Sequence, residues 1–174
     1  DKGPKFGNYS GWRVGNLLKA MDVVLVRDRP EAAIIMIGTN DISGNRVPAG
    51  YRAGLESVIA KCLKTHCVPI LNTIPPRRGH DTAVKEINQI IRALALKHNL
   101  PLADFHNACL RVRPGNTWDG TIISKDGVHP SGGKTNLYSE VNLKTSGYAL
   151  RNWVNFLVLR QLHFRVFEHQ PKWD

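Results

Sequence analysis

The stretch that most restricts the fold of this chain is the apolar run Ala32-Ala33-Ile34-Ile35-Met36-Ile37, which Gly38-Thr39-Asn40-Asp41 follows at once. A strand with one solvated face alternates apolar and polar residues, and this run does not. The pattern predicts an inner strand of a parallel sheet that helices cover on both faces. Ligands bind beyond the carboxyl ends of such strands, where Asn40 and Asp41 stand. Taken alone, however, Gly-Thr-Asn-Asp favours an ordinary turn and helix cap.

Amphipathic stretches with helical spacing alternate with short apolar runs along the rest of the chain. Helices are predicted from Arg13 to a stop at Pro30, from Pro48 through Leu63, from a cap at Asp81 or Thr82 through Leu94, and after a cap at Thr145 or Ser146. Further strands are predicted at residues 68–74 and 100–105. The last helix is expected to direct one set of side chains into the core: Leu150, Trp153, Val154, Leu157 and Leu162. Residues 106–146 are Gly-rich and predicted to be mostly irregular, which in a compact domain is typical of a functional loop.

This alternation of helices and strands predicts an α/β fold with a parallel sheet. Only three strands can be assigned, whereas a typical sheet has about five. Because the run at residues 32–38 has the composition of an inner strand, we expect strands to be missing on the amino-terminal side. The chain begins at Asp1 without Met, so we expect it to be part of a longer protein. Residues 1–174 are expected to form one domain, since a chain of this length can bury a proper core.

Composition excludes several classes of function. The formal net charge is +10, yet the 24 Lys and Arg residues are scattered rather than gathered in a basic stripe with aromatic residues, so no nucleic-acid partner is expected. No run approaches the roughly 18 apolar residues of a membrane span. The seven His and three Cys residues have no metal-ligand spacing, and no Gly-rich phosphate loop follows a strand. We therefore expect no metal, no cofactor and no membrane association, and the compartment stays undecided.

A second polar cluster, Asp126-Gly127-Val128-His129-Pro130, lies in the long late loop. Asp-x-x-His in a tight turn lets the carboxylate bond one imidazole nitrogen and leaves the other free to face a nucleophile. Asp-Gly is also a strong turn dipeptide, in which case His129 has no chemical role. Alone, this cluster does not decide between the two interpretations.

Together, the two clusters resemble the SGNH (GDSL-type) hydrolase family. Gly38-Thr39-Asn40-Asp41 follows an apolar strand, and Asp126-x-x-His129 precedes a final helix, as in that family. Tyr9-Ser10-Gly11-Trp12 is similar to its glycine block, while Pro75-Pro76 and Gly147-Tyr148 match its usual punctuation. Each motif is weak by itself, but the ordered combination runs across nearly the whole chain and is specific.

The resemblance implies a flavodoxin-like, three-layer α/β/α fold and ester hydrolysis by a serine nucleophile, without a cofactor. It assigns His129 as general base and Asp126 as the acid that orients it. It also assigns the Gly11 backbone N–H and the Asn40 side-chain amide as oxyanion donors, a role in which fixed donors are worth about 3–4 kcal/mol each. Asp41 is expected to brace the Asn40 loop or to cap the next helix.

The chain departs from the family at the nucleophile. It contains no Gly-Asp-Ser, and only ten residues precede Gly11. Ser10 directly precedes the oxyanion glycine, where the family has no nucleophile, and Ser124 and Ser131 are expected to be loop hydroxyls. Two hypotheses remain. In the first, a serine outside this chain completes an esterase for small acyl esters, with carbohydrate O-acetyl esters as one candidate class. In the second, the domain is an inactive carbohydrate-binding or interaction module.

Other residues have rival interpretations. Asp104 and His106 form a second acid–histidine pair, but we expect Asp104 to stabilise a loop and His106 to lie at the surface. Aromatic rings stack on pyranose faces, which suggests three residues for a sugar cleft: Trp12, Trp118 and Tyr148. Asp41 is retained as a candidate substrate contact because it adjoins the expected site. The pair Arg77-Arg78 is expected to be solvated.

Overall fold

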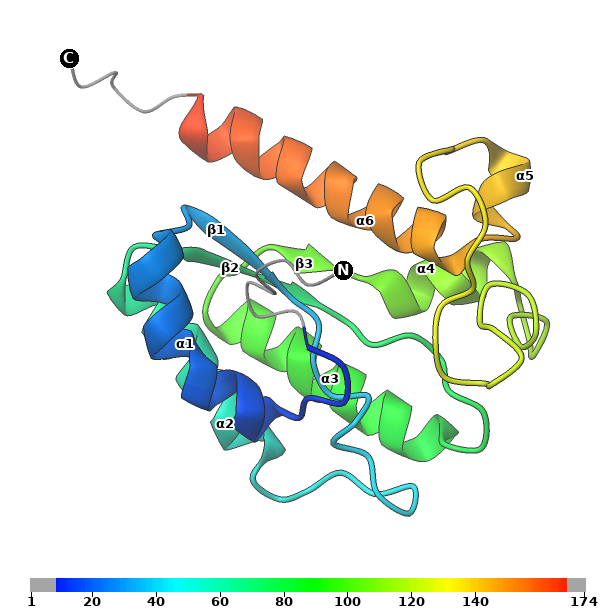
Figure 1. Cartoon of the computed structure of the whole chain (residues 1–174), viewed down its shortest axis with the longest axis horizontal. Helices are drawn as coiled ribbons and strands as arrows, with labels where there is room; N and C mark the ends of the chain where they lie inside the picture. The colour runs from blue at the N-terminus through cyan, green and yellow to red at the C-terminus, as the bar shows by residue number, and fades with distance from the viewer. Residues whose placement is uncertain (1–8, 169–174) are drawn as a thin grey trace.

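The computed structural model describes residues 9–168, and the sheet within them has three strands. In chain order the elements are α1 (Val14–Asp28), β1 (Ala32–Ile35), α2 (Tyr51–Lys64), β2 (Val68–Asn72), α3 (Asp81–Lys97), β3 (Leu102–Ala103), α4 (Phe105–Val112), α5 (Glu140–Leu143), α6 (Gly147–Leu162) and the π-helical turn η1 (His163–Phe167) (Figure 1). The predicted alternation of helices and strands is confirmed.

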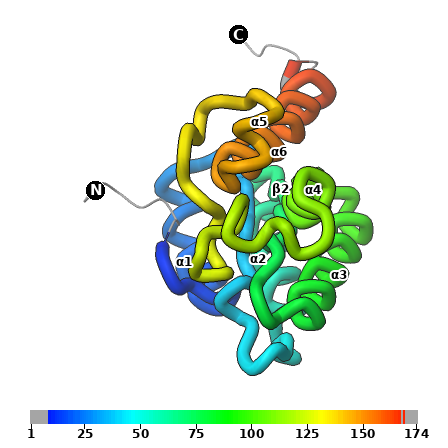
Figure 2. The backbone as a smooth tube through the Cα atoms, turned by 90° about the vertical axis from the view of Figure 1, so that its right-hand side faces the viewer, coloured from blue at the N-terminus to red at the C-terminus, as the bar shows by residue number. Residues whose placement is uncertain are grey.

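The sheet is parallel, with strand order β1-β2-β3. Ile34 lies opposite Ile70 across the first pair of strands, and Leu71 lies opposite Leu102 across the second. Because the strands are parallel, their carboxyl ends share one edge of the sheet. The segment between α4 and α5 runs around that end of the molecule (Figure 1 and Figure 2).

Helices cover both faces of the sheet, so the fold has three layers, α/β/α (Figure 1). The larger core joins α1, α2 and α3 to one face through Ile35 and Leu71. On the other face, Ile70 and Ala103 pack with Leu162 of α6. Alternate residues of a strand point to opposite faces, which is why neighbours such as Ile70 and Leu71 enter different cores.

The length of β1 corrects one expectation, because the strand ends at Ile35 and not at residue 38. Within residues 9–168 β1 is an edge strand, which agrees with the expectation that strands are missing beside a strand of inner composition. Its Ile34 side chain is 42% exposed. β1 therefore has the apolar composition of an inner strand but only one strand partner in the described chain.

Several helix predictions are also corrected. His80, not Asp81 or Thr82, precedes the first residue of α3, and it forms no side-chain capping bond. The supposedly irregular region begins with α4, because Asp104 accepts the Asn107 N–H and caps a helix where the third strand was predicted to continue. For α6, the cap at Ser146 is confirmed by its bond from the Ala149 N–H.

The core face of α6 differs in part from the prediction. Leu150 and Leu162 are buried as expected, but Leu157 is 38% exposed. Trp153 is half-buried and contacts the rings of Tyr138 and Phe156. Within residues 9–168, no helix combines the length and apolar character needed to cross a membrane.

Candidate active site

Asp126 and His129 form a tightly bonded pair in the turn beyond α4. The Asp126 Oδ2 atom lies 2.7 Å from His129 Nδ1. Its other oxygen, Oδ1, accepts the Ser124 hydroxyl at 2.7 Å and the Val128 and His129 N–H groups at 2.8 and 3.0 Å. The Ser124 and Val128 bonds, with those from His129, hold the pKa of Asp126 well below its usual range. The carboxylate therefore stays ionised, and it fixes the imidazole through Nδ1.

Two neighbouring segments hold this turn in place. On one side, Arg78 donates its N–H to the Gly127 carbonyl and forms a two-bond ion pair with Asp119. Gly127 has φ +73°, and a Cβ atom there would lie 2.7 Å from the Cβ of Arg78, so this close approach requires glycine. The turn is thus anchored to the loop that follows β2.

On its other side, the turn is joined to the start of α6. The Ser131 hydroxyl donates to the Thr145 carbonyl and accepts the Gly147 N–H, while the Ser131 carbonyl accepts the Tyr148 N–H. A Cβ atom on Gly147 would lie 1.9 Å from the Ile122 carbonyl oxygen. The absence of a side chain at Gly147 is what lets the helix begin against this loop.

The two proposed oxyanion donors come from different segments. Asn40 follows β1 and is exposed, and its Nδ2 atom donates to the Trp12 carbonyl at 3.2 Å. That bond uses one of the two amide hydrogens and leaves the second available. Gly11 is exposed with φ +75°, in the turn before α1. The Asn40–Trp12 bond ties these two segments together.

A single cleft of about 790 Å³ brings most of the predicted site residues together. Its lining includes Gly11, Trp12, Asn40, His129 and Tyr148. Asp126 supports His129 from behind and does not line the cleft. The remaining lining comes mainly from the end of β1, the end of β2 and one side of α6.

Asp41 lies beneath the site, outside the lining of the cleft. It is 4% exposed, and both of its carboxylate oxygens accept the Val14 N–H at 3.1 Å. Burial raises the pKa of Asp41, and the Val14 bond opposes that shift. The carboxylate ties the Asn40 loop to the first residue of α1, which agrees with the first of the two predicted roles, bracing of that loop, and not with capping of the next helix. The geometry therefore gives no support to Asp41 as a substrate contact.

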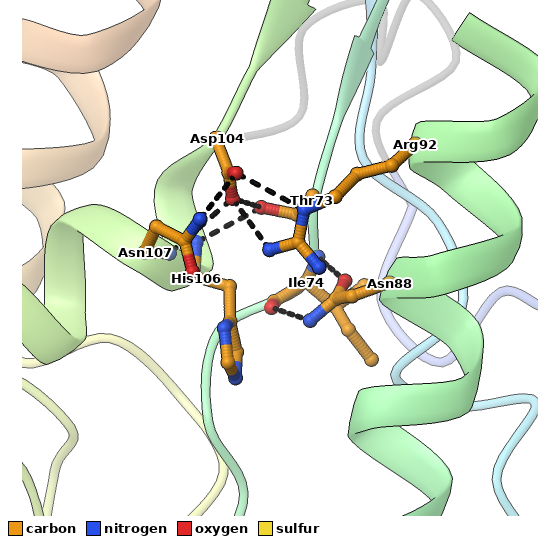
Figure 3. A network of polar contacts seen from close by, with 7 residues as sticks. All are labelled: Thr73, Ile74, Asn88, Arg92, Asp104, His106 and Asn107. Carbon is orange, nitrogen blue, oxygen red and sulfur yellow. Dashed lines mark hydrogen bonds and ion pairs between the residues drawn. The ribbon is translucent and has the colours of Figure 1, made fainter. Parts of the chain in front are cut away.

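The rival pair Asp104 and His106 is not a dyad in this structure. Asp104 accepts two bonds from Arg92 and one from the Thr73 hydroxyl, and the His106 ring points away from its carboxylate (Figure 3). Burial opposes ionisation of Asp104, but the bonds from Arg92 and Asn107 outweigh it and lower its pKa. His106 is half-buried rather than at the surface, and burial lowers its pKa. As predicted, Asp104 stabilises a loop, because it binds Thr73 in the segment that follows β2.

Two further expectations are corrected, one of them in part. Trp118 is 4% exposed and packs in the core with Phe105, so it cannot line a sugar cleft. The expectation of a solvated Arg77-Arg78 pair is wrong for Arg77 and is confirmed for Arg78, which is exposed. Arg77 is half-buried and donates to the Thr39 carbonyl at 2.7 Å, and Arg78 binds Asp119.

Three polar residues of the cleft were missed from the sequence: Asn72, Arg151 and Asn155. Asn72 could have been found, because it ends a buried strand just as Asn40 follows one. Arg151 and Asn155 carry no such signal, since α6 has apolar residues around most of its circumference. Within residues 9–168, no group of three His, Cys, Asp or Glu side chains is placed to hold a metal ion.

Comparison with solved structures supports the fold. The lipase/acylhydrolase from Enterococcus faecalis is 26% identical, with a TM-score of 0.65 over 94% of this chain and 75% of that one. A GDSL-like lipase from Bacteroides thetaiotaomicron VPI-5482 is 17% identical, with a TM-score of 0.66 over 88% and 74% of the two chains. A catalytic mutant of an acetylxylan esterase from Geobacillus stearothermophilus is 21% identical, with a TM-score of 0.61 over 70% and 62%. In that esterase, a serine-to-alanine and a histidine-to-alanine exchange are each described as catalytic mutants.

Comparison with curated proteins gives no match. The family model of the GDSL-like lipase/acylhydrolases matches residues 5–132, which is more than half of the chain and includes the Asn40 and His129 segments. The order of motifs, the three-layer fold and this match agree, and the chain belongs to the GDSL-like lipase/acylhydrolase family.

Proposed function

We propose that this chain is the larger part of a serine esterase for small acyl esters, including O-acetyl groups on carbohydrates, and that the nucleophilic serine lies outside it. The observation that carries the proposal is that Asn40 and His129, whose Nδ1 atom is bonded to Asp126, line one cleft. A base and a neutral hydrogen-bond donor that face the same space are what acyl transfer requires. The acetylxylan esterase among the structural neighbours supports the choice of substrate class.

In the proposed reaction, the serine oxygen attacks the ester carbonyl carbon while its proton passes to His129 Nε2. Asp126, ionised and bonded to Nδ1, stabilises the resulting imidazolium. The negative charge on the carbonyl oxygen is met by the Gly11 N–H and the second Asn40 amide hydrogen. The carbon–oxygen bond to the alcohol then breaks, and the alcohol leaves with the proton from His129. Water repeats the sequence on the acyl-enzyme, releases the acid and restores the serine.

The competing function is a carbohydrate-binding module without activity, and one observation favours it. The described serines near the pair already have other partners: Ser124 donates to Asp126, and Ser131 donates to Thr145. Ser10 lines the cleft, but it directly precedes Gly11, where the family has no nucleophile. A cleft without its own nucleophile can bind an ester and leave it intact.

The test compares this chain with a longer form that includes the coding sequence upstream of Asp1. Release of acetate from acetylated xylan and hydrolysis of para-nitrophenyl acetate are measured for both. We expect turnover from the longer form only. In that form, His129→Ala should remove activity, while His106→Ala, the matched change in the rival pair, should retain most of it.

Three outcomes would contradict the proposal. An inactive longer form with an intact fold would favour the binding module. Full activity of the His129→Ala variant would exclude the assigned base. Turnover by the chain alone that Ser10→Ala removes would identify an internal nucleophile and exclude an external one.

A further inference from the structure

The side of the cleft formed by α6 contains a cation that has no carboxylate partner in residues 9–168. Arg151 is half-buried and lines the cleft, and its guanidinium carbon lies 4.9 Å from the centroid of the Tyr148 ring. Arg92, another half-buried arginine, binds Asp104, whereas the half-buried Arg77 and Arg113 donate to backbone carbonyls away from the α6 wall of the cleft. Burial lowers the pKa of Arg151, which reflects the cost of a desolvated charge without an anion. A negatively charged ligand group beside Arg151 would therefore stabilise its buried charge.

The floor of the same cleft contains an unpaired polar atom. Asn72 lines the cleft and is only 1% exposed. Its Nδ2 atom donates to Asn155 Oδ1 at 2.7 Å, and its Oδ1 atom is buried without a partner. Turning both amides over would reverse this bond and leave the Asn72 nitrogen unpaired instead. In either arrangement, one buried polar atom of Asn72 has no partner within residues 9–168, and leaving it unsatisfied costs about 1–3 kcal/mol.

These groups define the chemistry of a ligand. A guanidinium matches a planar carboxylate through two parallel hydrogen bonds. The Asn72 amide oxygen needs a hydroxyl donor, and the exposed part of an aromatic ring such as Trp12 offers a flat apolar surface. A carboxylate, hydroxyl groups and a flat ring face occur together in sugar acids.

From this arrangement we propose that Arg151, Asn72 and Asn155 form a subsite for a carboxylated sugar, so that the substrate is an ester on an acidic rather than a neutral carbohydrate. Arg151 binds the sugar carboxylate, and Asn72 accepts a hydrogen bond from a neighbouring hydroxyl. The inference rests on the proposed esterase function for the position of the ester beside His129. The binding step itself needs neither the serine nor an ester bond.

The test therefore measures binding by the chain of 174 residues. D-glucuronate, D-glucose and sodium sulfate are titrated separately at constant ionic strength, with calorimetry as the readout. Arg151→Gln is the test variant. Arg160→Gln is its matched control, because Arg160 lies on the same helix, is exposed and does not line the cleft. Arg151→Lys, which retains charge but loses the two-bond geometry, is the second test variant.

We expect glucuronate to bind at least about tenfold more tightly than glucose, as a charge-assisted pair of bonds would provide. Arg151→Gln should remove this preference, Arg151→Lys should reduce it, and Arg160→Gln should leave it unchanged. Equal affinity for glucose, no binding of glucuronate, or a preference that survives in both Arg151 variants would overturn the proposal. Sulfate binding as tight as that of glucuronate would also overturn it, because the site would then accept any anion.

Failure of the proposed sugar-acid subsite and failure of the proposed hydrolysis would give different experimental results. His129→Ala should leave glucuronate affinity unchanged while it removes esterase activity in the longer form. Loss of the glucuronate preference would remove the acidic substrate class and leave the esterase intact. Glucuronate binding with no turnover in any form would retain the subsite and favour the binding module.

Discussion

At the scale of single residues, we expect the contribution of Asp126 to the stability of the folded chain to depend on pH in the acid range. Its bonds from Ser124, Val128 and His129 keep its pKa below the ordinary value of 3.8. A depressed carboxyl pKa stabilises the folded state above the unfolded pKa, and this stabilisation is lost as the pH falls through the folded value. We expect Asp126→Asn to lower the urea midpoint at neutral pH, and the gap from the wild type to shrink below about pH 4. A gap that stays constant down to about pH 2 would contradict this account.

The Asn40 amide should act on kcat more than on KM, because an oxyanion donor strengthens its bond in the transition state. In the active longer form, Asn40→Ala is expected to lower kcat by about a hundredfold or more with little change in KM. Asn116→Ala, an exposed asparagine away from the cleft, is the control and should leave both constants unchanged. An Asn40→Ala variant that raises only KM would indicate a ground-state contact instead.

Residues could be predicted from the sequence where the contacts that place them are local. Asp126 and His129 are three positions apart, and the turn that joins them explains their bond. Arg151 and Asn155 could not be predicted, because the side of α6 that faces the cleft depends on how the whole helix packs against Ile70 and Ala103. Helical periodicity gives no guidance where apolar residues surround most of a helix.

At the scale of elements, the junction between α6 and the His129 loop depends on Gly147. A methyl group there would overlap the Ile122 carbonyl oxygen at 1.9 Å, and neither backbone can move without breaking the Ser131 bonds. We expect Gly147→Ala to destabilise the fold by about 3 kcal/mol or more in urea unfolding.

Gly15→Ala is the matched control for that change. Gly15 is exposed in the first turn of α1, and a Cβ atom there meets nothing within 4 Å. The same exchange should therefore stabilise the chain slightly, by about 0.4–1 kcal/mol. Equal effects of the two variants would show that helix propensity, and not the contact at Ile122, determines the result.

Element types were predictable because period and composition agree along most of the chain. The predicted boundaries of helices and strands were wrong where a side chain forms a local hydrogen bond that periodicity does not reveal. Asp104 caps α4 and so ends the third strand early, and its bonds to Thr73 and Arg92 come from distant segments (Figure 3). The short length of β3 is thus a consequence of this polar network.

At the scale of the whole molecule, we expect self-association at the side of β1 that has no strand partner in the described residues. Within residues 9–168, β1 pairs only with β2, and Ile34 is 42% exposed beside it. Unpaired strand edges with apolar side chains recruit other strands. We expect the 174-residue chain to form dimers or larger species in light scattering as its concentration rises, and Ile34→Lys to reduce them.

Leu96→Lys is the control for that experiment. Leu96 is more exposed than Ile34, at 85%, but it lies on α3 and away from the sheet edge. If both lysine variants suppress association equally, general apolar exposure or added charge is responsible and not the edge of β1.

The layer order and the parallel sheet followed from the chain's own pattern, since alternating helices and strands leave few other arrangements. The edge position of β1 agrees with the expectation of missing strands, because apolar composition shows the burial for which a strand is suited and not the neighbours that are present. The cleft could be foreseen only in outline, as the end of the sheet where polar residues follow the strands.

The Tyr9–Trp12 segment and α6 line the same cleft although they lie near the two ends of the described chain. A ligand that contacts both Trp12 and Arg151 would therefore connect a segment near the beginning of the described chain with a helix near its end. A bound sugar acid should slow amide hydrogen exchange in both segments at once, and it should also make both segments more resistant to proteolysis.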